Sequence, residues 1–393
     1  MVITNGFTYI AFLMCLAGGL LALEKYTKWK IFNIVPPLVW IYVLNMVFCT
    51  MGLYHSKEVS AAYKALKNNL LYAMIFVMLL RCDFRKLAKL GARMVAIFLG
   101  CSVTLFAGFI IGYPIFKGFL GKDTWGAVAA LYASWVGGSA NMAAMQAALP
   151  VDAGAYSCAL ALDTVCYSVW IALLLLMVRY ADKWNNATKA DTSKLQAVAD
   201  AAAAEVAKEK RSASSADWIF LIGVSLLVSA ISQAVGASLN ASLKAVGLGM
   251  FDKGTMTTVF VTVLGLVCAM SPLGKVPAVE ELSSVYLYAV VSLLASTATV
   301  TDLLAAPMWV VYGFFILAIH VVGMFILSKL FHWDLCMVST ASLANIGGAA
   351  SAPIVASAYD ASYAGIGVLM GVLGAAVGNF AGLICGYVLK MMQ

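Results

Sequence analysis

The sequence predicts an all-α polytopic membrane protein with two repeats of inverted topology. Each repeat is expected to hold about five spanning helices and one re-entrant or broken helix with a Gly-Gly turn. Of the 393 residues, 63% are hydrophobic and only 11% are charged, whereas a soluble domain has roughly 25% charged residues. Long apolar runs recur along the chain, and two Gly-Gly pairs interrupt such runs at corresponding places in the two halves.

Ten apolar runs are long enough to be spanning helices, which need about 20 residues each. The alternating pattern of barrel strands is absent, so the spans are expected to be helical. The expected spans are residues 6–23, 30–52, 66–82, 92–116, 153–179, 217–237, 255–271, 283–300, 306–330 and 361–389. Two further apolar segments, 124–149 and 335–357, contain the Gly-Gly pairs.

A long polar segment divides the chain into a first membrane repeat, residues 1–181, and a second, residues 217–393. Residues 182–216 form a charged linker between them, with an Ala-rich surface helix expected in its middle. The linker is cationic, which places it in the cytoplasm by the positive-inside rule. Its basic residues are Lys183, Lys189, Lys194, Lys208, Lys210 and Arg211.

Charge order sets the orientation of the first spans. No basic residue precedes the first apolar run, whereas Lys25, Lys28 and Lys30 follow it, so the N-terminus is expected outside. If residues 124–149 crossed the membrane, the linker would lie outside. A re-entrant hairpin that turns at Gly137-Gly138 keeps the linker inside. Each arm of about 12 residues would be about 18 Å long, which reaches the middle of a roughly 30 Å core.

Short matches recur in the same order in both halves. Because five spans are an odd number, the second half is inverted, and the two Gly-Gly turns should converge near the midplane. Inverted repeats with broken helices at the midplane are typical of secondary transporters; the alternative is a structural protein whose glycines serve only helix packing. The matches are Leu71-Tyr72-Ala73 with Leu287-Tyr288-Ala289, Leu87 with Leu303, Gly137-Gly138 with Gly347-Gly348, and Asp152 with Asp360.

The turns carry groups that suit ligand binding. An incoming half-helix ends in free carbonyl groups that suit a cation, and an outgoing one begins with free N–H groups that suit an anion. Glycine lets a ligand approach the backbone. Polar side chains at the turns either cap the half-helices or also contact ligand. These side chains are Ser139, Asn141, Asn345 and Ser351.

Asp163 lies near the middle of an expected span, with the Thr164 hydroxyl beside it. An acid at this depth usually faces a cavity, a partner or an ion. We expect Asp163 to bind the coupling cation, with Na⁺ preferred, or to carry a proton. The alternative is a protonated carboxyl bonded to the hairpin backbone. His320 also lies mid-span, where hydrogen-bonded packing is favoured over proton relay.

The stretches SWVGGSANMAAM, ALDTV and ASLANIGGAASAPIVASA resemble the signature regions of the YjcL-like bacterial membrane proteins, the domain of unknown function 819. The resemblance spans most of the chain and implies a multi-pass protein of the bacterial inner membrane. Two positions depart from the family pattern: Thr164 replaces the Asn that typically follows the acid, and Ala349 replaces a Pro after the second Gly-Gly. The layout is more remotely similar to sodium-coupled 2-hydroxycarboxylate and glutamate symporters, and to bile-acid-type symporters and cation antiporters. That similarity implies an elevator-like motion and a homodimer.

These features together predict a secondary active transporter that couples a cation gradient, Na⁺ rather than H⁺, to symport of a small carboxylate or amino acid. One alternative is a cation/proton antiporter that uses Asp163; another is a non-transporting membrane partner or regulator. We expect no enzyme activity, because no HExxH or GxSxG motif occurs in a fitting context. No cofactor is expected beyond a Na⁺ ion, and no nucleic-acid partner, since the net charge of +7 lies in loops.

Overall fold

The computed structural model describes residues 2–29, 31–32, 35–192, 195–207, 212–245, 253–301 and 306–393. Within them the secondary structure is helical, and seven helices are long and apolar enough to cross a membrane. The prediction of an all-α polytopic membrane protein is confirmed. Several positions used above lie outside the described residues: the start of the 30–52 span with Lys30, the linker cations Lys194, Lys208, Lys210 and Arg211, and Leu303.

In its described part, each of the ten expected spans contains a helix. The first half contains α1 (Gly6–Thr27), α3 (Pro37–Thr50), α4 (Lys57–Leu79), α5 (Phe84–Leu87), the short 3₁₀ turn η1 (Ala88–Leu90), α6 (Gly91–Leu120), α7 (Trp125–Gly137), α8 (Ser139–Ala148) and α9 (Ala153–Met177). The helix α4 begins nine residues before its expected span of 66–82, because Ser56 caps it by accepting a hydrogen bond from Val59 N.

The linker and second half follow the same pattern. They contain η2 (Val178–Tyr180), α10 (Ala181–Thr188), α11 (Leu195–Ala207), α12 (Ser215–Ala245), α13 (Lys253–Ala269), η3 (Pro272–Lys275), α14 (Val279–Ala295), α15 (Ala306–Phe331), α16 (Leu335–Tyr359), η5 (Ala361–Tyr363) and α17 (Ala364–Met391). The Ala-rich helix expected within the linker is α11.

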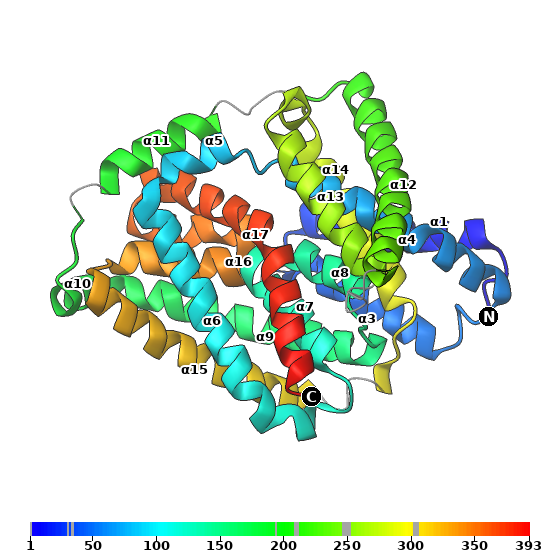
Figure 1. The fold of residues 1–393 in the computed structure, drawn as a ribbon, viewed down its shortest axis with the longest axis horizontal. Coiled ribbons are helices and arrows are strands. Elements are labelled where there is room, and N and C mark those ends of the chain that lie inside the picture. The colour runs from blue at the N-terminus through cyan, green and yellow to red at the C-terminus, as the bar shows by residue number, and fades with distance from the viewer. Residues whose placement is uncertain are drawn as a thin grey trace.

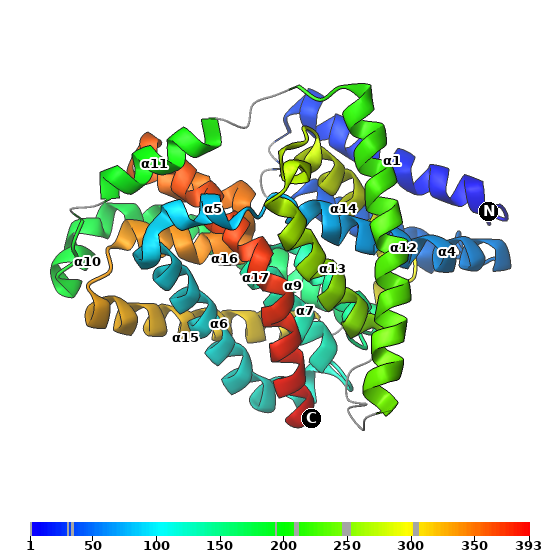
Figure 2. The same ribbon diagram turned by 45° about the horizontal axis from the view of Figure 1, so that its top comes forward.

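The helices form two groups that lie side by side in Figures 1 and 2. We call the first group the panel; it contains α1, α3, α4, α12, α13 and α14. The second group, the hairpin core, contains α6, α7, α8, α9, α15, α16 and α17. Each group takes its helices from both halves of the sequence, so the two halves interleave in space.

Corresponding helices of the two halves run antiparallel where they meet. At one end of the α4–α14 pair, Arg81 lies 3.2 Å from Glu280. At the other end, Tyr63 on α4 hydrogen-bonds Thr297, which follows α14. In the core, two hydrogen bonds join α6 to α15. Thr104 Oγ1 lies 2.7 Å from His320 Nδ1, and Trp309 Nε1 donates to Leu120 O at 3.2 Å. Antiparallel pairing of corresponding helices is the arrangement that an inverted topology requires.

Candidate functional site

The helices α7 and α8 form a hairpin that turns at Gly138. This residue has φ 95°, a conformation that favours glycine. The open end of the hairpin is closed by direct contact, since a Cβ atom on Gly126 would collide with Pro150 O. The two ends of residues 124–149 therefore lie together. We call this element the first hairpin.

The helix α16 forms a second hairpin. By length and composition its 25 residues could cross a membrane, but the chain turns back at Gly348, which has φ 70°. Ser339 Oγ lies 3.2 Å from the Tyr359 hydroxyl, whereas a straight helix would separate these residues by about 30 Å. The segment is therefore re-entrant in shape, like the first hairpin.

The two hairpins lie tip to tip along α17. A Cβ placed on Gly348 would come within 3.9 Å of Gly138 Cα, so the two turns meet. Glycines on α17 contact the hairpins in linear order. Four of them, Gly367, Gly371, Gly374 and Gly378, meet hairpin backbone atoms, whereas Gly382 and Gly386 meet hairpin side chains. From the N-terminal side the contacts are Gly367 with Ala352 and Pro353, Gly371 with Ala349, Gly374 with Val136, Gly378 with Gly137 and Asn141, Gly382 with Ala133 and Met145, and Gly386 with Leu149 and Ala129.

Asp163 lies against the first hairpin, one turn before its tip. Its Oδ1 accepts a hydrogen bond from Trp135 Nε1 at 2.8 Å, and its Oδ2 accepts one from Ser134 Oγ at 3.0 Å. The residue is 9% exposed. Among the described residues, none of the ion pairs involves Asp163. A buried acid without a cationic partner is the kind of group that binds an ion or proton.

One helical turn further along α9, Tyr167 contacts the second hairpin. A Cβ on Gly347 would approach Tyr167 Cε2 to 2.6 Å, and the tyrosine hydroxyl hydrogen-bonds Ser351. Asp163 and Tyr167 therefore bring one face of α9 to both hairpin tips. Sequence reasoning missed Tyr167, although its i+4 spacing from the acid was a usable signal.

Asn141 joins the first hairpin to α17 and, through it, to the panel. Its Nδ2 donates to Asn379 Oδ1 at 2.9 Å and to Ala375 O at 3.2 Å. Asn379 Nδ2 in turn donates to Thr262 Oγ1 on α13 at 3.0 Å. Because the amide nitrogen faces two acceptors, the opposite atom must be the oxygen. That Oδ1 is buried, lacks a hydrogen-bond partner and lies beside Gly137.

The remaining predicted residues differ in their availability to a ligand. The Asn345 amide is fully used by protein groups: Oδ1 accepts from Ser102 Oγ at 2.7 Å, and Nδ2 donates to the Phe98 and Ala341 carbonyls. It therefore anchors the incoming arm of the second hairpin to α6.

The hydroxyl groups at the tips are bonded locally. Ser351 Oγ donates to Gly347 O at 2.6 Å, across the second turn. Thr164 Oγ1 donates to Leu160 O on its own helix at 2.9 Å. Ser139 is the first residue of α8, directly after the Gly138 turn. The structure therefore gathers Gly137, Gly138, Ser139, Asn141, Asp163, Gly347, Gly348 and Ser351 at the tips. Asn345 is instead an anchor to α6, and the Thr164 hydroxyl bonds within its own helix.

The electrostatic character of the tip is set by oxygen atoms. The last carbonyl groups of a helix have no partner within it. In this last turn of α7, the side chains of Ser134 and Trp135 hold the Asp163 carboxylate, and Asn141 Oδ1 lies beside Gly137. Within the described residues, no three or more His, Cys, Asp or Glu side chains lie together in a group that could hold a metal ion. The oxygens at the tip suit a monovalent cation more than one that needs several charged ligands.

His320 belongs to a separate, fully bonded network. Thr104 donates its proton to Cys101 O, so it must accept from His320 Nδ1. His320 Nε2 is then the acceptor for Ser342 Oγ at 2.8 Å, and that oxygen accepts from Trp170 Nε1 at 3.0 Å. A neutral imidazole therefore satisfies every donor and acceptor in this chain of hydrogen bonds, which agrees with the expected packing role.

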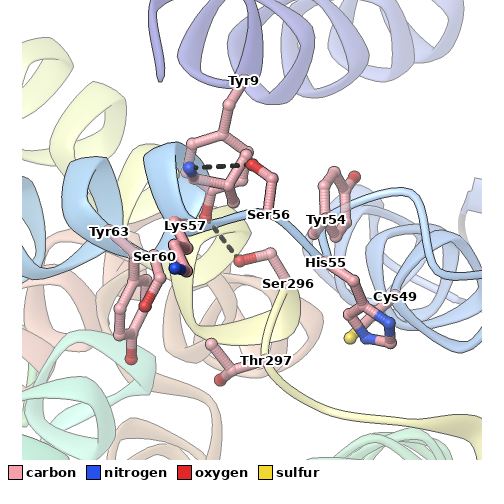
Figure 3. A pocket seen from close by; sticks show the side chains of 11 residues that line it. Tyr9, Cys49, Tyr54, His55, Ser56, Lys57, Ser60, Tyr63, Ser296 and Thr297 are labelled. Atoms are coloured by element: carbon pink, nitrogen blue, oxygen red, sulfur yellow. Dashed lines mark hydrogen bonds between the residues drawn. The ribbon is translucent and has the colours of Figure 1, made fainter. Parts of the chain in front are cut away.

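A cavity of about 490 Å³ lies elsewhere, between α1, the start of α4 and the end of α14 (Figure 3). Its hydroxyl groups bond one another and the backbone: Tyr9 and Ser296 are 2.6 Å apart, and Ser296 donates to Leu293 O. All its lining residues belong to panel helices or their loops. It is therefore separate from the hairpin tips.

The fold and the site together define a multi-pass helical membrane protein with two helical hairpins that meet at their turns. The chain belongs to the family described as protein of unknown function (DUF819), whose model matches residues 11–392. Comparison with curated proteins and with solved structures gives no match. The predicted resemblance to this family is confirmed.

Proposed function

We propose that the protein is a secondary active transporter in which a cation gradient drives uptake of a small organic solute. The observation that carries the proposal is the meeting of the Gly138 and Gly348 turns beside the buried Asp163 carboxylate. Irregular backbone inside a membrane protein persists where it lines a binding site or a wet cavity. Transport accounts for this arrangement without any catalytic group.

The cation is assigned to the C-terminal end of α7. There the negative end of the helix dipole, the Asp163 carboxylate and Asn141 Oδ1 all favour positive charge. Both carboxylate oxygens already accept hydrogen bonds from Trp135 and Ser134, which suits the ionised form. Since neutral and anionic oxygens are the ligands that hard cations prefer, Na⁺ is favoured over H⁺.

The solute is assigned to the N-terminal ends of α8 and of the outgoing arm of α16. These ends begin at Ser139 and just after Gly348, and the first N–H groups of a helix generally lack a partner within it. Such groups bind carboxylates. A small carboxylate or amino acid fits this site, and a bound cation would offset its charge.

An elevator-like motion would move the hairpin core along the panel. Hydrogen bonds that cross between the two groups include Thr255 Oγ1 to Ala148 O at 2.8 Å, Asn379 to Thr262 at 3.0 Å, and Tyr42 to Ser157 at 3.1 Å. These bonds would have to break and re-form during transport. A homodimer, proposed by family analogy, would hold the panel fixed in the bilayer.

A cation/proton antiporter is the second candidate, and one observation favours it. Asp163 is the acid that contacts the tip of the first hairpin, so one carboxyl group could exchange a cation for a proton. In that case no organic solute would be needed.

A stability screen separates these functions and can identify the solute. The purified protein would be melted with a panel of carboxylates and amino acids, each in Na⁺ and in choline buffers. Symport predicts that one solute raises Tm more in Na⁺ than in choline, because ligands that bind the folded state stabilise it. Stabilisation by Na⁺ alone supports antiport. If no solute and no cation changes Tm, the binding site proposed here is wrong, and a non-transporting partner is favoured.

A further inference from the structure

The linker helix α10 holds the incoming leg of the second hairpin. Asn185 Oδ1 accepts a hydrogen bond from Leu335 N at 2.9 Å, on the first residue of α16. Thr188 Oγ1 lies 3.3 Å from Trp333 O, and His332 Nδ1 lies 2.8 Å from Thr188 O. The start of this hairpin is therefore fixed by side chains and backbone of the linker.

The helix α11 packs on η5 and the first turn of α17, the segment that directly follows the outgoing leg. Ala199 and Ala202 on α11 are fully buried. A Cβ on Gly365, in the first turn of α17, would lie 2.8 Å from Ala203 N, so the two backbones touch. Gln196 Nε2 is also 3.5 Å from Ser362 Oγ in η5. Figures 1 and 2 show α11 lying beside the N-terminal end of α17.

The two hairpins differ in how their open ends are closed. The first hairpin closes on itself, through the contact of Gly126 with Pro150 O. The second has a bond between its legs, Ser339 to Tyr359, and in addition the linker at its open end. There α10 contacts the incoming leg, and α11 contacts the η5–α17 segment that follows the outgoing leg. Opening of the second hairpin would therefore require its legs to leave the linker, whereas opening of the first would not.

The α11 contact is small. It combines the buried Ala199 and Ala202 with the partly buried side chains of Leu195 and Val198, so it brings together only a modest apolar surface. An exposed ion pair between Arg93 NH1 and Asp191 Oδ2, 3.3 Å, ties the segment between α10 and α11 to the start of α6. Exposed ion pairs of this kind are weak and sensitive to salt.

We infer that α10 and α11 form a clamp across the open end of the second hairpin, and that release of α11 lets the hairpin open. The clamp regulates access to the tip site, and in that respect the inference rests on the proposed function. A simple spacer between the core and the panel would also need a chain segment here. It would not need contacts to both ends of one hairpin, to the incoming leg through α10 and to the segment after the outgoing leg through α11.

Labelling of one cysteine tests the clamp. In a full-length, cysteine-free background, Ser339→Cys places a thiol between the legs, at a position that is fully buried and faces Tyr359. The rate of reaction with a membrane-permeant maleimide then reports hairpin opening. Ala202→Glu puts a charge into the α11 contact. Its matched control is Ala204→Glu, on the exposed side of the same helix.

The clamp predicts that Ala202→Glu raises the labelling rate about tenfold through local opening, while Ala204→Glu leaves it unchanged. A disulfide between Gln196→Cys and Ser362→Cys should lower the rate relative to the reduced protein, and this arm decides the question if Ala202→Glu does not fold. Equal rates in both Glu variants, or no effect of the disulfide, would overturn the clamp. Because labelling needs neither solute nor gradient, such a result leaves the transport proposal standing, and absence of transport leaves the clamp standing.

Discussion

At the scale of single residues, the Asp163 carboxylate is the most constrained polar group at the hairpin tips. Its two oxygen atoms accept from different residues of one turn of α7, so α9 fixes the end of the half-helix whose carbonyl groups face the tip. The carboxylate charge lies beside the negative C-terminal end of the α7 dipole and in the same tip region as the partially negative Asn141 oxygen. A bound cation would offset this negative charge.

We therefore expect Asp163→Asn to remove cation-dependent stabilisation while the fold persists. The amide oxygen can still accept from Trp135 and the amide nitrogen can donate to Ser134, but the negative charge is gone. Cation-driven uptake should fall at least about tenfold, which corresponds to about 1.4 kcal/mol of lost coupling energy. The matched control is Asp152→Asn, because Asp152 is an exposed helix cap that Asn can replace. Full cation-coupled uptake in Asp163→Asn would show that the carboxylate is not part of the coupling.

Asp334 is a second buried acid, placed outside the spans as the cap of the second hairpin. It accepts a hydrogen bond from Met337 N at 2.9 Å and is 2% exposed. Burial raises the pKa of Asp334, while the Met337 N–H and the Arg93 guanidinium partly oppose that shift. Since the folded state holds the proton more tightly than the unfolded state, this carboxyl group loses stabilising free energy as pH rises above the usual Asp range.

The Asp334→Asn variant tests whether Asp334 lowers the stability of the fold as pH rises. Asn keeps the cap but does not titrate, so its Tm relative to wild type should increase as pH rises from about 4 to about 7. Thermal melting of both proteins across that range measures the difference, and contributions from all other groups cancel. A difference that stays constant with pH would contradict the raised pKa.

At the scale of elements, α17 is the surface on which both hairpins rest. Its glycines contact one hairpin along residues 367–371 and the other along residues 374–386. Small residues let helix backbones approach closely where the bilayer provides no hydrophobic drive. The helix therefore sets the distance between the two tips.

We predict that Gly378→Ala destabilises the protein by about 1–3 kcal/mol through overpacking. A Cβ there would lie 2.7 Å from Asn141 Nδ2 and 3.1 Å from Gly137 Cα, at the tip of the first hairpin. The control is Gly118→Ala on α6, where a Cβ meets nothing within 4 Å. Denaturant unfolding in detergent compares the two, and equal effects would mean that close approach to α17 is not required.

Most of the helices and both chain reversals could be predicted from the sequence. Apolar run length gave the spans, and charge order together with Gly137-Gly138 and Gly347-Gly348 gave the chain reversals, because these signals are local. The hydrogen-bond partners of Asp163, Asn141 and Asn345 were not accessible. They come from helices distant in sequence, and no periodic pattern marks which side chains will meet. The start of α4 was placed too late, because the Ser56 cap outweighs the polar composition of the first turns.

At the scale of the whole molecule, two groups of helices share an interface that both halves of the sequence build. The proposed orientation places the N-terminus outside and the linker in the cytoplasm. Asp152, at the open end of the first hairpin, then lies outside. The linker residue Ser212 lies inside, and both residues are exposed.

Single cysteines at these two positions test the orientation. In a cysteine-free background, an impermeant maleimide applied to whole cells should label Asp152→Cys, and should label Ser212→Cys only after the membrane is opened. This follows from a hairpin that returns to its side of entry. Labelling of both residues from one side would contradict the re-entrant topology in the membrane.

Transport in proteoliposomes tests the central claim most directly. Uptake of the stabilising solute would be followed under an inward Na⁺ gradient, with a choline gradient of equal strength as control, for wild type and Asp163→Asn. We predict that wild type concentrates the solute above its external level in the Na⁺ gradient only, and that Asp163→Asn does not. If wild-type vesicles neither accumulate a solute nor dissipate the Na⁺ gradient, the protein is not a cation-coupled transporter.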